Sequence, residues 1–202
     1  NLNKGAPMLT QKQKIVKRGF DIVLSLLLLP IILIPLLILW ILLTLSTGCN
    51  GWYVQLRIGQ HGKPFSFYKL RTLKGENHKD INEIKAKETA FGGWLRKTKL
   101  DEIPQLFNVL KGDMSWVGPR PDISGYADML KEEDRVILSV KPGITGPATI
   151  KYKNEDQLLL RQSNPLEYND TVIWPDKVKM NKEYIQQWSF KKDLWYLWRS
   201  IF

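Results

Sequence analysis

The chain has 202 residues, a formal net charge of +10 and a single cysteine, Cys49. One cysteine excludes an internal disulfide bond and a cysteine-rich zinc site, and two histidines are too few for a histidine metal cluster. The positive charge indicates an anionic partner, a class that includes nucleic acid, anionic lipid and phosphorylated small molecules. We predict a basic tail and membrane segment over residues 1–50 and one globular domain over residues 51–202.

Residues 22–45 carry no charged side chain. As a helix this run would be about 36 Å long, enough to cross a hydrocarbon core of about 30 Å. Pro30 and Pro35 each remove a backbone donor and favour a kink in the middle of the run. The run is too long for a signal peptide. We therefore predict a membrane helix with a hinge at the two prolines.

Basic residues flank this run on both sides: Lys4, Lys12, Lys14, Lys17 and Arg18 before it, and Arg57, Lys63, Lys69, Arg71 and Lys74 after it. Basic flanks are typical of the cytoplasmic side of a membrane, so both ends are expected there. Two interpretations follow from the charges. In one, a re-entrant hairpin turns back at the prolines, with its freed backbone groups buried by protein or at the interface. In the other, a kinked helix crosses once as an anchor.

The remaining elements follow from hydrophobic periodicity and turn residues. In chain order we predict strands at 52–56 and 65–73 joined by a turn at 59–64, a polar loop or loose helix at 75–88, helices at 89–99 and 101–110, a Gly/Pro-rich loop at 117–121, a helix at 128–138, a second such loop at 142–147, a helix at 155–162 and an irregular connection at 164–176.

The last segment, residues 188–202, interleaves large apolar side chains with Lys191, Lys192 and Arg199. This composition is typical of an amphipathic helix in the membrane interface, where tryptophan and tyrosine are favoured. The alternative is a C-terminal helix docked on the core. The fold class we predict is α/β, mostly helical with a small β-hairpin, an N-terminal re-entrant membrane helix and C-terminal interfacial amphipathic helices.

Asp101 and Glu102 stand just before Pro104 at a predicted helix start. Acids at that position also have a structural explanation, since they cap backbone donors and complement the helix dipole by about 0.3–1 kcal/mol. Their surroundings favour chemistry, because cations cluster nearby in the sequence: Lys69, Arg71, Lys97, Lys99, Lys111 and Arg120. A carboxylate among cations stays ionised and can share a divalent metal with a diphosphate. The alternative for the cations is a solvated or lipid-headgroup surface.

Motifs of other catalytic classes are absent from the sequence: there is no Walker loop, no dinucleotide-binding glycine fingerprint, no HExxH and no GxSxG. Five segments, taken together and in this order, resemble the bacterial sugar transferases, or monotopic phosphoglycosyl transferases: KRGFD at 17–21 before the proline-broken run, FYKLRT at 67–72, LDEIPQLFNVLKGDMS at 100–115, VGPRP at 117–121 and PGITG at 142–146. A fainter similarity continues at Tyr184 and at 188–190.

The resemblance implies an enzyme that moves a sugar 1-phosphate from a UDP-sugar to polyprenyl (undecaprenyl) phosphate, the first membrane step of capsule, exopolysaccharide, O-antigen or glycoprotein glycan assembly. It implies that Asp101 is the nucleophile and carries a covalent phosphosugar. Glu102 would assist as a base or by orienting the metal and acceptor. Mg²⁺ would lie between Asp101 and the diphosphate.

The resemblance further implies that Arg120, beside Pro121, holds a phosphate with help from Lys69 and Arg71, and that the loop with Gly143 and Gly146 shapes the donor pocket. It favours the re-entrant form of the helix, which would keep the active site at the cytoplasmic face of the bacterial inner membrane. Residues 147–154 and 164–181 depart from the family pattern, with Asn181 near an expected acid, so we assign no role there.

Two rival functions differ in class from this enzyme. A membrane-anchored, non-enzymatic adaptor would use the basic face to bind anionic lipid or a protein. A membrane-tethered nucleic-acid binder would show steep salt dependence of its affinity. Interleaved acids and the lack of a binding motif make the nucleic-acid binder the weakest of the three, and we expect no nucleic-acid partner.

Overall fold

The computed structural model describes residues 8–75 and 87–201. The chain forms two compact units, each assembled from segments that are distant in the sequence. The first unit contains the chain up to Asp21, then Arg57–Phe65 and Gly112–Phe202, and the second contains Ile22–Leu56 and Ser66–Lys111. The division into a membrane segment over 1–50 and a domain over 51–202 stays a prediction.

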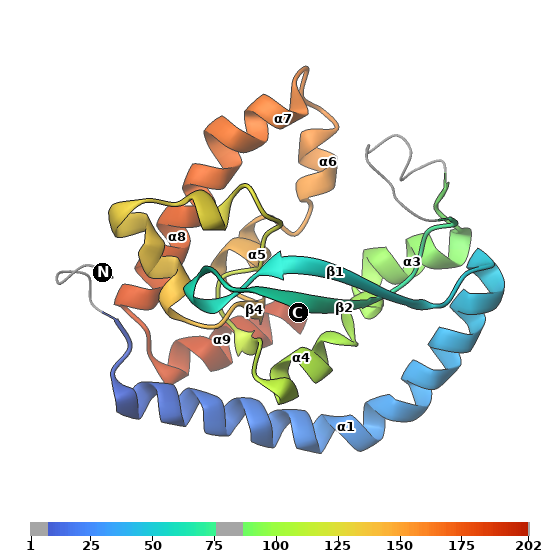
Figure 1. The fold of residues 1–202 in the computed structure, drawn as a ribbon, viewed down its shortest axis with the longest axis horizontal. Coiled ribbons are helices and arrows are strands. Elements are labelled where there is room, and N and C mark those ends of the chain that lie inside the picture. The colour runs from blue at the N-terminus through green and yellow to red at the C-terminus, as the bar shows by residue number, and fades with distance from the viewer. Residues whose placement is uncertain (1–7, 76–86, 202) are drawn as a thin grey trace. The chain divides into compact units, whose positions relative to one another are not determined.

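The long apolar helix α1 spans Gln11–Thr47 and is continuous through Pro30 and Pro35. Figure 1 shows it bending along its second half, the part that holds both prolines. Among the described residues it is the one helix whose length and composition suffice to cross a membrane. Its apolar side chains are largely uncovered, with Leu27, Ile31 and Ile34 each more than 60% exposed. The membrane helix is thus consistent with the structure, and its re-entrant course stays a prediction.

The predicted hairpin is confirmed. Strands β1 (Trp52–Ile58) and β2 (Pro64–Leu70) pair in a two-stranded sheet, with a short 3-10 turn, η1 (Gln60–Gly62), between them. The predicted helix at 89–99 is also confirmed as α3 (Ala90–Thr98), which begins where Thr89 Oγ1 accepts a hydrogen bond from the Gly92 amide. The core of the second unit consists of leucines from α1, β2 and α3: Leu36, Leu43, Leu70 and Leu95.

The single helix predicted at 101–110 is wrong. The structure has a 3-10 turn, η2 (Leu100–Glu102), followed by a separate helix, α4 (Gln105–Lys111). Lys99 adopts a left-handed conformation, with φ 60°, and ends α3. The turn between Lys99 and α4 is held by bonds to carbonyls three residues back, such as Glu102 N–H to Lys99 O at 3.1 Å. Pro104 has no amide hydrogen and cannot donate a helical bond before α4 begins.

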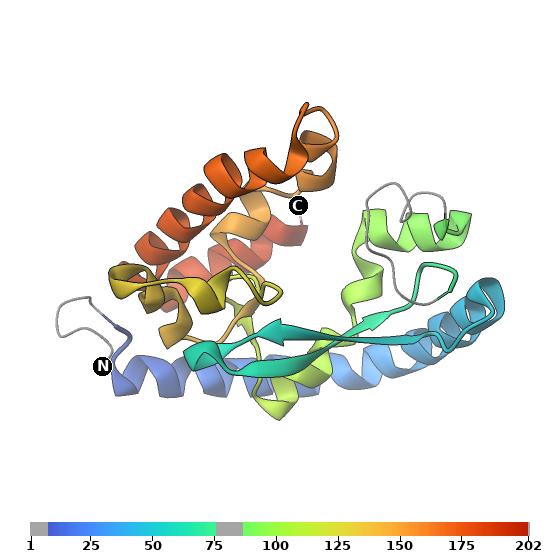
Figure 2. The ribbon, with the colours of Figure 1, turned by 45° about the horizontal axis from the view of Figure 1, so that its top comes forward.

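In the first unit, strands β3 (Ser115–Val117) and β4 (Gly143–Thr145) pair in parallel, with Ser115 opposite Gly143 and Val117 opposite Thr145. Helix α5 (Pro147–Lys151) follows and contacts both α8 (Trp174–Gln186) and α9 (Phe190–Ile201); the three lie together in Figure 2. Buried apolar side chains from these elements and their loops form the core, among them Ile58, Val117, Val136, Val178 and Ile185.

Three further predictions need correction. The helix expected at 128–138 is a pair of 3-10 segments, η3 (Ala127–Met129) and η4 (Glu132–Ser139), because the chain is extended at Leu130 and Lys131 and Glu132 has φ 48°. The helix expected at 155–162 is shorter, α6 (Glu155–Leu159). The connection at 164–176 is not irregular: Asn164 caps α7 (Pro165–Tyr168), which continues through a π-helical segment, η5 (Asn169–Ile173), into α8.

The C-terminal segment is helical, as predicted. On α9 the side chains of Leu194, Trp195, Trp198 and Ile201 are exposed, each by more than 40%. The position of α9 in a membrane interface stays a prediction. Most of the loop predicted at 75–88 lies outside the described residues.

Candidate active site

The paired acids Asp101 and Glu102 lie on the 3-10 turn η2 in the second unit. Both are buried, with 6% and 8% of their surfaces exposed. Lys99 fixes the start of this turn through its left-handed backbone, and Pro104 separates it from α4. Both carboxylates are therefore held below the surface. Acids that only cap a helix on the surface would be exposed.

A cation from the hairpin faces this turn. Lys69, on β2, places its ammonium 3.1 Å from Glu102 Oε1, and its side chain is 20% exposed. The same ammonium lies 5.4 Å from the centre of the Phe67 ring. The structure thus brings together three of the predicted site residues, Lys69, Asp101 and Glu102, within the second unit.

Asn108 fixes the register between the hairpin and the helix that follows the acids. This buried residue of α4 donates from Nδ2 to Ser66 O at 2.6 Å and accepts at Oδ1 from the Tyr68 amide at 3.1 Å. Because both partners belong to β2, the amide joins α4 to the strand that carries Lys69. Sequence reasoning missed Asn108, since its partners are 40 and 42 positions away.

The electrostatics of the turn are dominated by burial. Removal from water raises the pKa of Asp101 above its ordinary value; the Lys69 ammonium opposes this rise and the neighbouring Glu102 adds to it. Asp101 Oδ1 is buried and has no hydrogen-bond partner in the described part of the chain. A desolvated carboxylate oxygen without a partner is suited to bind a cation or to attack an electrophile.

Arg71 has a different environment. Its Nε donates to Asn50 O at 2.8 Å, its Nη1 donates to Gly75 O at 3.1 Å, and its guanidinium lies 5.4 Å from the Tyr53 ring centre. These contacts anchor the chain on both sides of the hairpin. The predicted phosphate contact of Arg71 stays a prediction.

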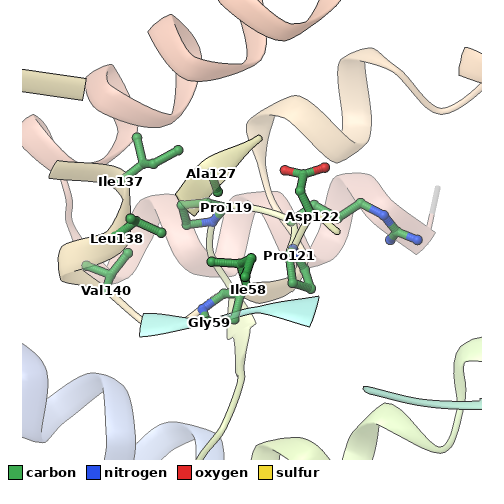
Figure 3. Close-up of a pocket in the computed structure, with 11 residues that line it drawn as sticks. Ile58, Gly59, Pro119, Pro121, Asp122, Ala127, Ile137, Leu138 and Val140 are labelled. Carbon is green, nitrogen blue, oxygen red and sulfur yellow. The ribbon is translucent and has the colours of Figure 1, made fainter. Parts of the chain in front are cut away.

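Arg120 and Pro121 belong to the first unit, in the loop after β3. They line a small cavity, shown in Figure 3, together with residues that include Ile58, Pro119 and Asp122. Its volume of ≈ 20 Å³ corresponds to about one water molecule, so this cavity does not admit a nucleotide or a sugar. Burial raises the pKa of the Asp122 carboxyl, while the cations Lys177, Arg57 and Arg120 oppose the rise. Sequence reasoning missed Asp122, because a single acid beside prolines in a loop does not indicate burial.

Gly143 and Gly146 allow the backbones of β4 and the 117–121 loop to touch. A Cβ atom on Gly143 would lie 2.1 Å from Gly118 N, and one on Gly146 would lie 2.3 Å from Gly118 O. No larger residue fits at either position without moving the backbone. This packing gives both glycines a structural role, and their part in a donor pocket stays a prediction.

A buried ion pair joins the start of α1 to α9 within the first unit. Lys17 Nζ lies 2.6 Å from Asp193 Oδ2, which also accepts from Trp188 Nε1 at 3.0 Å, while Tyr184 OH donates to Oδ1 at 2.6 Å. Asp21, four residues after Lys17 on α1, accepts hydrogen bonds from Ser115 Oγ and from the Trp116 amide. Sequence reasoning assigned Lys17 to the basic flank and missed this network, since its partner is 176 positions away.

Few side chains that could hold a metal ion lie together in the described part of the chain. Residues 8–75 and 87–201 contain no group of three or more His, Cys, Asp or Glu side chains arranged to hold an ion. Mg²⁺ is commonly bound by only one or two carboxylates together with substrate phosphates. The buried, unpaired oxygen of Asp101 fits that mode of binding.

Comparison with known proteins gives a consistent result. The family model described as bacterial sugar transferase matches residues 12–202. The chain is 36% identical to the uncharacterized sugar transferase EpsL of Bacillus subtilis over 182 residues, which cover 89% of this chain and 82% of EpsL.

Two longer proteins are also similar. The undecaprenyl-phosphate galactose phosphotransferase of Salmonella typhimurium is 33% identical over 210 residues, and the UDP-glucose:undecaprenyl-phosphate glucose-1-phosphate transferase of Escherichia coli is 33% identical over 197 residues. Each match covers 94% of this chain but only 40% of the longer protein.

Proposed function

Because the chain belongs to the bacterial sugar transferase family, we propose that it transfers a sugar 1-phosphate from a UDP-sugar to undecaprenyl phosphate. Two relatives support this substrate pair: the Salmonella protein is named for undecaprenyl phosphate and galactose, and the Escherichia protein for UDP-glucose and undecaprenyl phosphate. The observation that carries the proposal is the buried pair Asp101 and Glu102 beside the Lys69 ammonium, with Asp101 Oδ1 left without a partner.

In the first step a carboxylate oxygen of Asp101 attacks the phosphorus that bears the sugar. A new bond forms between that oxygen and phosphorus, and the bond from phosphorus to the bridging diphosphate oxygen breaks. Uridine monophosphate leaves with the bonding electron pair, and Asp101 carries the phosphosugar as an acyl phosphate. The positive charge of Lys69 supports this step, because it favours the ionised form of Asp101.

In the second step a phosphate oxygen of undecaprenyl phosphate attacks the same phosphorus. The bond to the Asp101 oxygen breaks, the free carboxylate is restored, and the product is a lipid diphosphate sugar. Splitting one displacement into two means that the water-soluble donor and the lipid acceptor need not be bound together. Glu102, paired with Lys69, helps to orient the attacking acceptor.

Asp101 is also the residue we propose to hold Mg²⁺. When bound, the ion neutralises charge on the phosphate oxygens and stabilises the departing phosphate. Arg120 is proposed as a phosphate-binding residue, because a guanidinium binds phosphate in a bidentate manner.

The proposed location is the cytoplasmic face of the bacterial inner membrane. The basic residues on both sides of the uncharged run 22–45 of α1, and the two prolines within that run, support a re-entrant helix. The exposed aromatic side chains of α9, with Lys191, Lys192 and Arg199 on the same helix, support its place in the interface. Both elements would hold the protein where the lipid acceptor is found.

The test is incubation of the purified protein with undecaprenyl phosphate, Mg²⁺ and a panel of UDP-sugars, with release of uridine monophosphate as the readout. We expect release with at least one sugar, and none from Asp101→Asn. No release across a broad panel, from protein shown to be folded, would favour the non-enzymatic adaptor.

A further inference from the structure

The amide side chain of Gln105 has an unusual environment. Gln105 is the first residue of α4 and has no exposed surface. Both of its polar atoms, Oε1 and Nε2, are buried and have no hydrogen-bond partner among the residues that the structure describes. Most buried side-chain amides are hydrogen-bonded, so this one requires an explanation.

A third unpaired atom belongs to the same short segment. Asp101 Oδ1 is also buried without a partner, four residues before Gln105. The chain between them is helical in character, with Ile103 N–H bonded to Leu100 O and Leu106 N–H bonded to Ile103 O. Both bonds reach three residues back, so the chain between the two side chains is a tight turn. An unpaired donor and an unpaired carboxylate oxygen are therefore both buried at this one turn, at the end of η2 and at the start of α4.

A second buried amide on α4, that of Asn108, has hydrogen-bond partners for both of its polar atoms. Asn108, three positions after Gln105, uses both its polar atoms on the backbone of β2. Gln105 therefore lies between an amide fixed by the hairpin and the carboxylate on η2. An apolar side chain of similar volume would fill the site of Gln105 without burying an unpaired amide. The amide stabilises the structure only if it acquires a polar partner.

We propose that Gln105 is a positioning residue for Asp101. Its Nε2 donates a hydrogen bond to Asp101 Oδ1, directly or through one buried water, and this bond holds the carboxylate in the orientation from which it attacks phosphorus. The inference rests on the proposed function, since it takes Asp101 as the nucleophile. Neither Gln105 Nε2 nor Asp101 Oδ1 has another partner in the described part of the chain, so both atoms are available for this bond.

The first test separates orientation from binding. In Gln105→Met, which keeps the volume and removes the donor, we expect the rate constant for phosphosugar transfer to Asp101 to fall roughly 10- to 100-fold, with KM for the UDP-sugar changed less than about twofold. Val109→Ala is the matched control, because Val109 is fully buried one turn later and offers no polar side-chain atom. The control is expected to lower stability and leave the rate constant unchanged. A wild-type rate constant in Gln105→Met would overturn the proposal.

The second test does not depend on turnover. Urea midpoints are measured in EDTA for wild type, Gln105→Met, Asp101→Ala and the double variant. Coupled side chains give midpoint shifts that are not additive, and we expect the double variant to lose less than the sum of the single losses. Additive shifts would refute the contact between the two side chains. A coupled pair in a protein that transfers no phosphosugar would instead contradict the proposed function and retain the contact.

A third variant covers the case in which Gln105→Met fails to fold. Gln105→Glu keeps the side-chain shape and replaces the amide donor by a carboxylate. We expect it to slow formation of the covalent adduct between Asp101 and the phosphosugar at least as much as Gln105→Met does. Adduct formation at the wild-type rate in folded Gln105→Glu would equally overturn the proposal.

Discussion

The ammonium of Lys69 lies 3.1 Å from the carboxylate of Glu102, although the two residues are 33 positions apart. We expect Lys69→Met to reduce phosphosugar transfer roughly 100-fold, because a cation that stabilises charge at the reacting centre is lost. Lys69→Arg keeps the charge and is expected to retain part of the activity. Release of uridine monophosphate, measured for both variants alongside circular dichroism spectra, checks this. Equal activity of Lys69→Met and wild type would remove Lys69 from the site.

The pH dependence of adduct formation follows from the burial of Asp101. Burial raises the pKa of Asp101 above the ordinary value of 3.8, and the nucleophile must be ionised. The rate is therefore expected to fall as the pH drops through this raised pKa. Because Lys69 lowers the pKa of Asp101, Lys69→Met is expected to move this acid limb to higher pH. The yield of the Asp101 adduct after a fixed reaction time, measured from pH 4 to 9, locates this acid limb for both proteins. A shift of the limb to lower pH in Lys69→Met would contradict the effect of Lys69 on Asp101.

Asn108 is expected to control the stability of the second unit. Asn108→Leu leaves the Tyr68 amide and the Ser66 carbonyl without their side-chain partner, which should cost about 1–3 kcal/mol per unpaired group. Asn108→Asp still accepts from the Tyr68 amide and so is expected to lose less. Urea unfolding compares the two variants. Equal stability of Asn108→Leu and wild type would show that the amide does not secure β2 to α4.

The buried pair Lys17 and Asp193 gives a prediction for the first unit. Removing one partner, as in Lys17→Met, leaves a buried charge and is expected to cost about 3–5 kcal/mol. The double variant Lys17→Met with Asp193→Asn removes both charges and should recover part of this loss. Thermal unfolding of the single and double variants measures the recovery. A double variant less stable than Lys17→Met would contradict the pairing.

The course of α1 is testable by cysteine labelling. In a Cys49→Ser background, single cysteines at Thr10 and at Gln55 are expected to react with a membrane-impermeant maleimide from the same side of sealed inner-membrane vesicles. Both positions flank the apolar run, and basic residues accompany each. Reaction from opposite sides would show that the helix crosses the membrane once.

Local patterns predicted the elements that depend on neighbouring residues. The β-branched and aromatic residues on both sides of the turn at 59–64 predicted the hairpin, and the segment 89–99, with basic residues towards its end, predicted α3. The 3-10 turn that carries Asp101 and Glu102 was not predicted, because the left-handed backbone of Lys99 gives no compositional signal.

Contacts between distant segments could not be predicted from local patterns. The register set by Asn108 depends on partners 40 and 42 positions away, and the burial of Lys17 depends on Asp193, which is 176 positions away. The same holds for the close approach of Gly143, on β4, to Gly118, in the loop after β3, where the two backbones touch. These features became visible only with the folded chain.

The central claim is that Asp101 becomes esterified by a sugar phosphate. The most direct measurement is intact-mass spectrometry of enzyme mixed with its UDP-sugar in the absence of lipid acceptor and quenched in acid. The account predicts a mass increase equal to one phosphosugar in wild type, its loss on adding undecaprenyl phosphate, and no increase in Asp101→Asn. An enzyme that releases uridine monophosphate without this adduct, or an adduct that persists in Asp101→Asn, would contradict it.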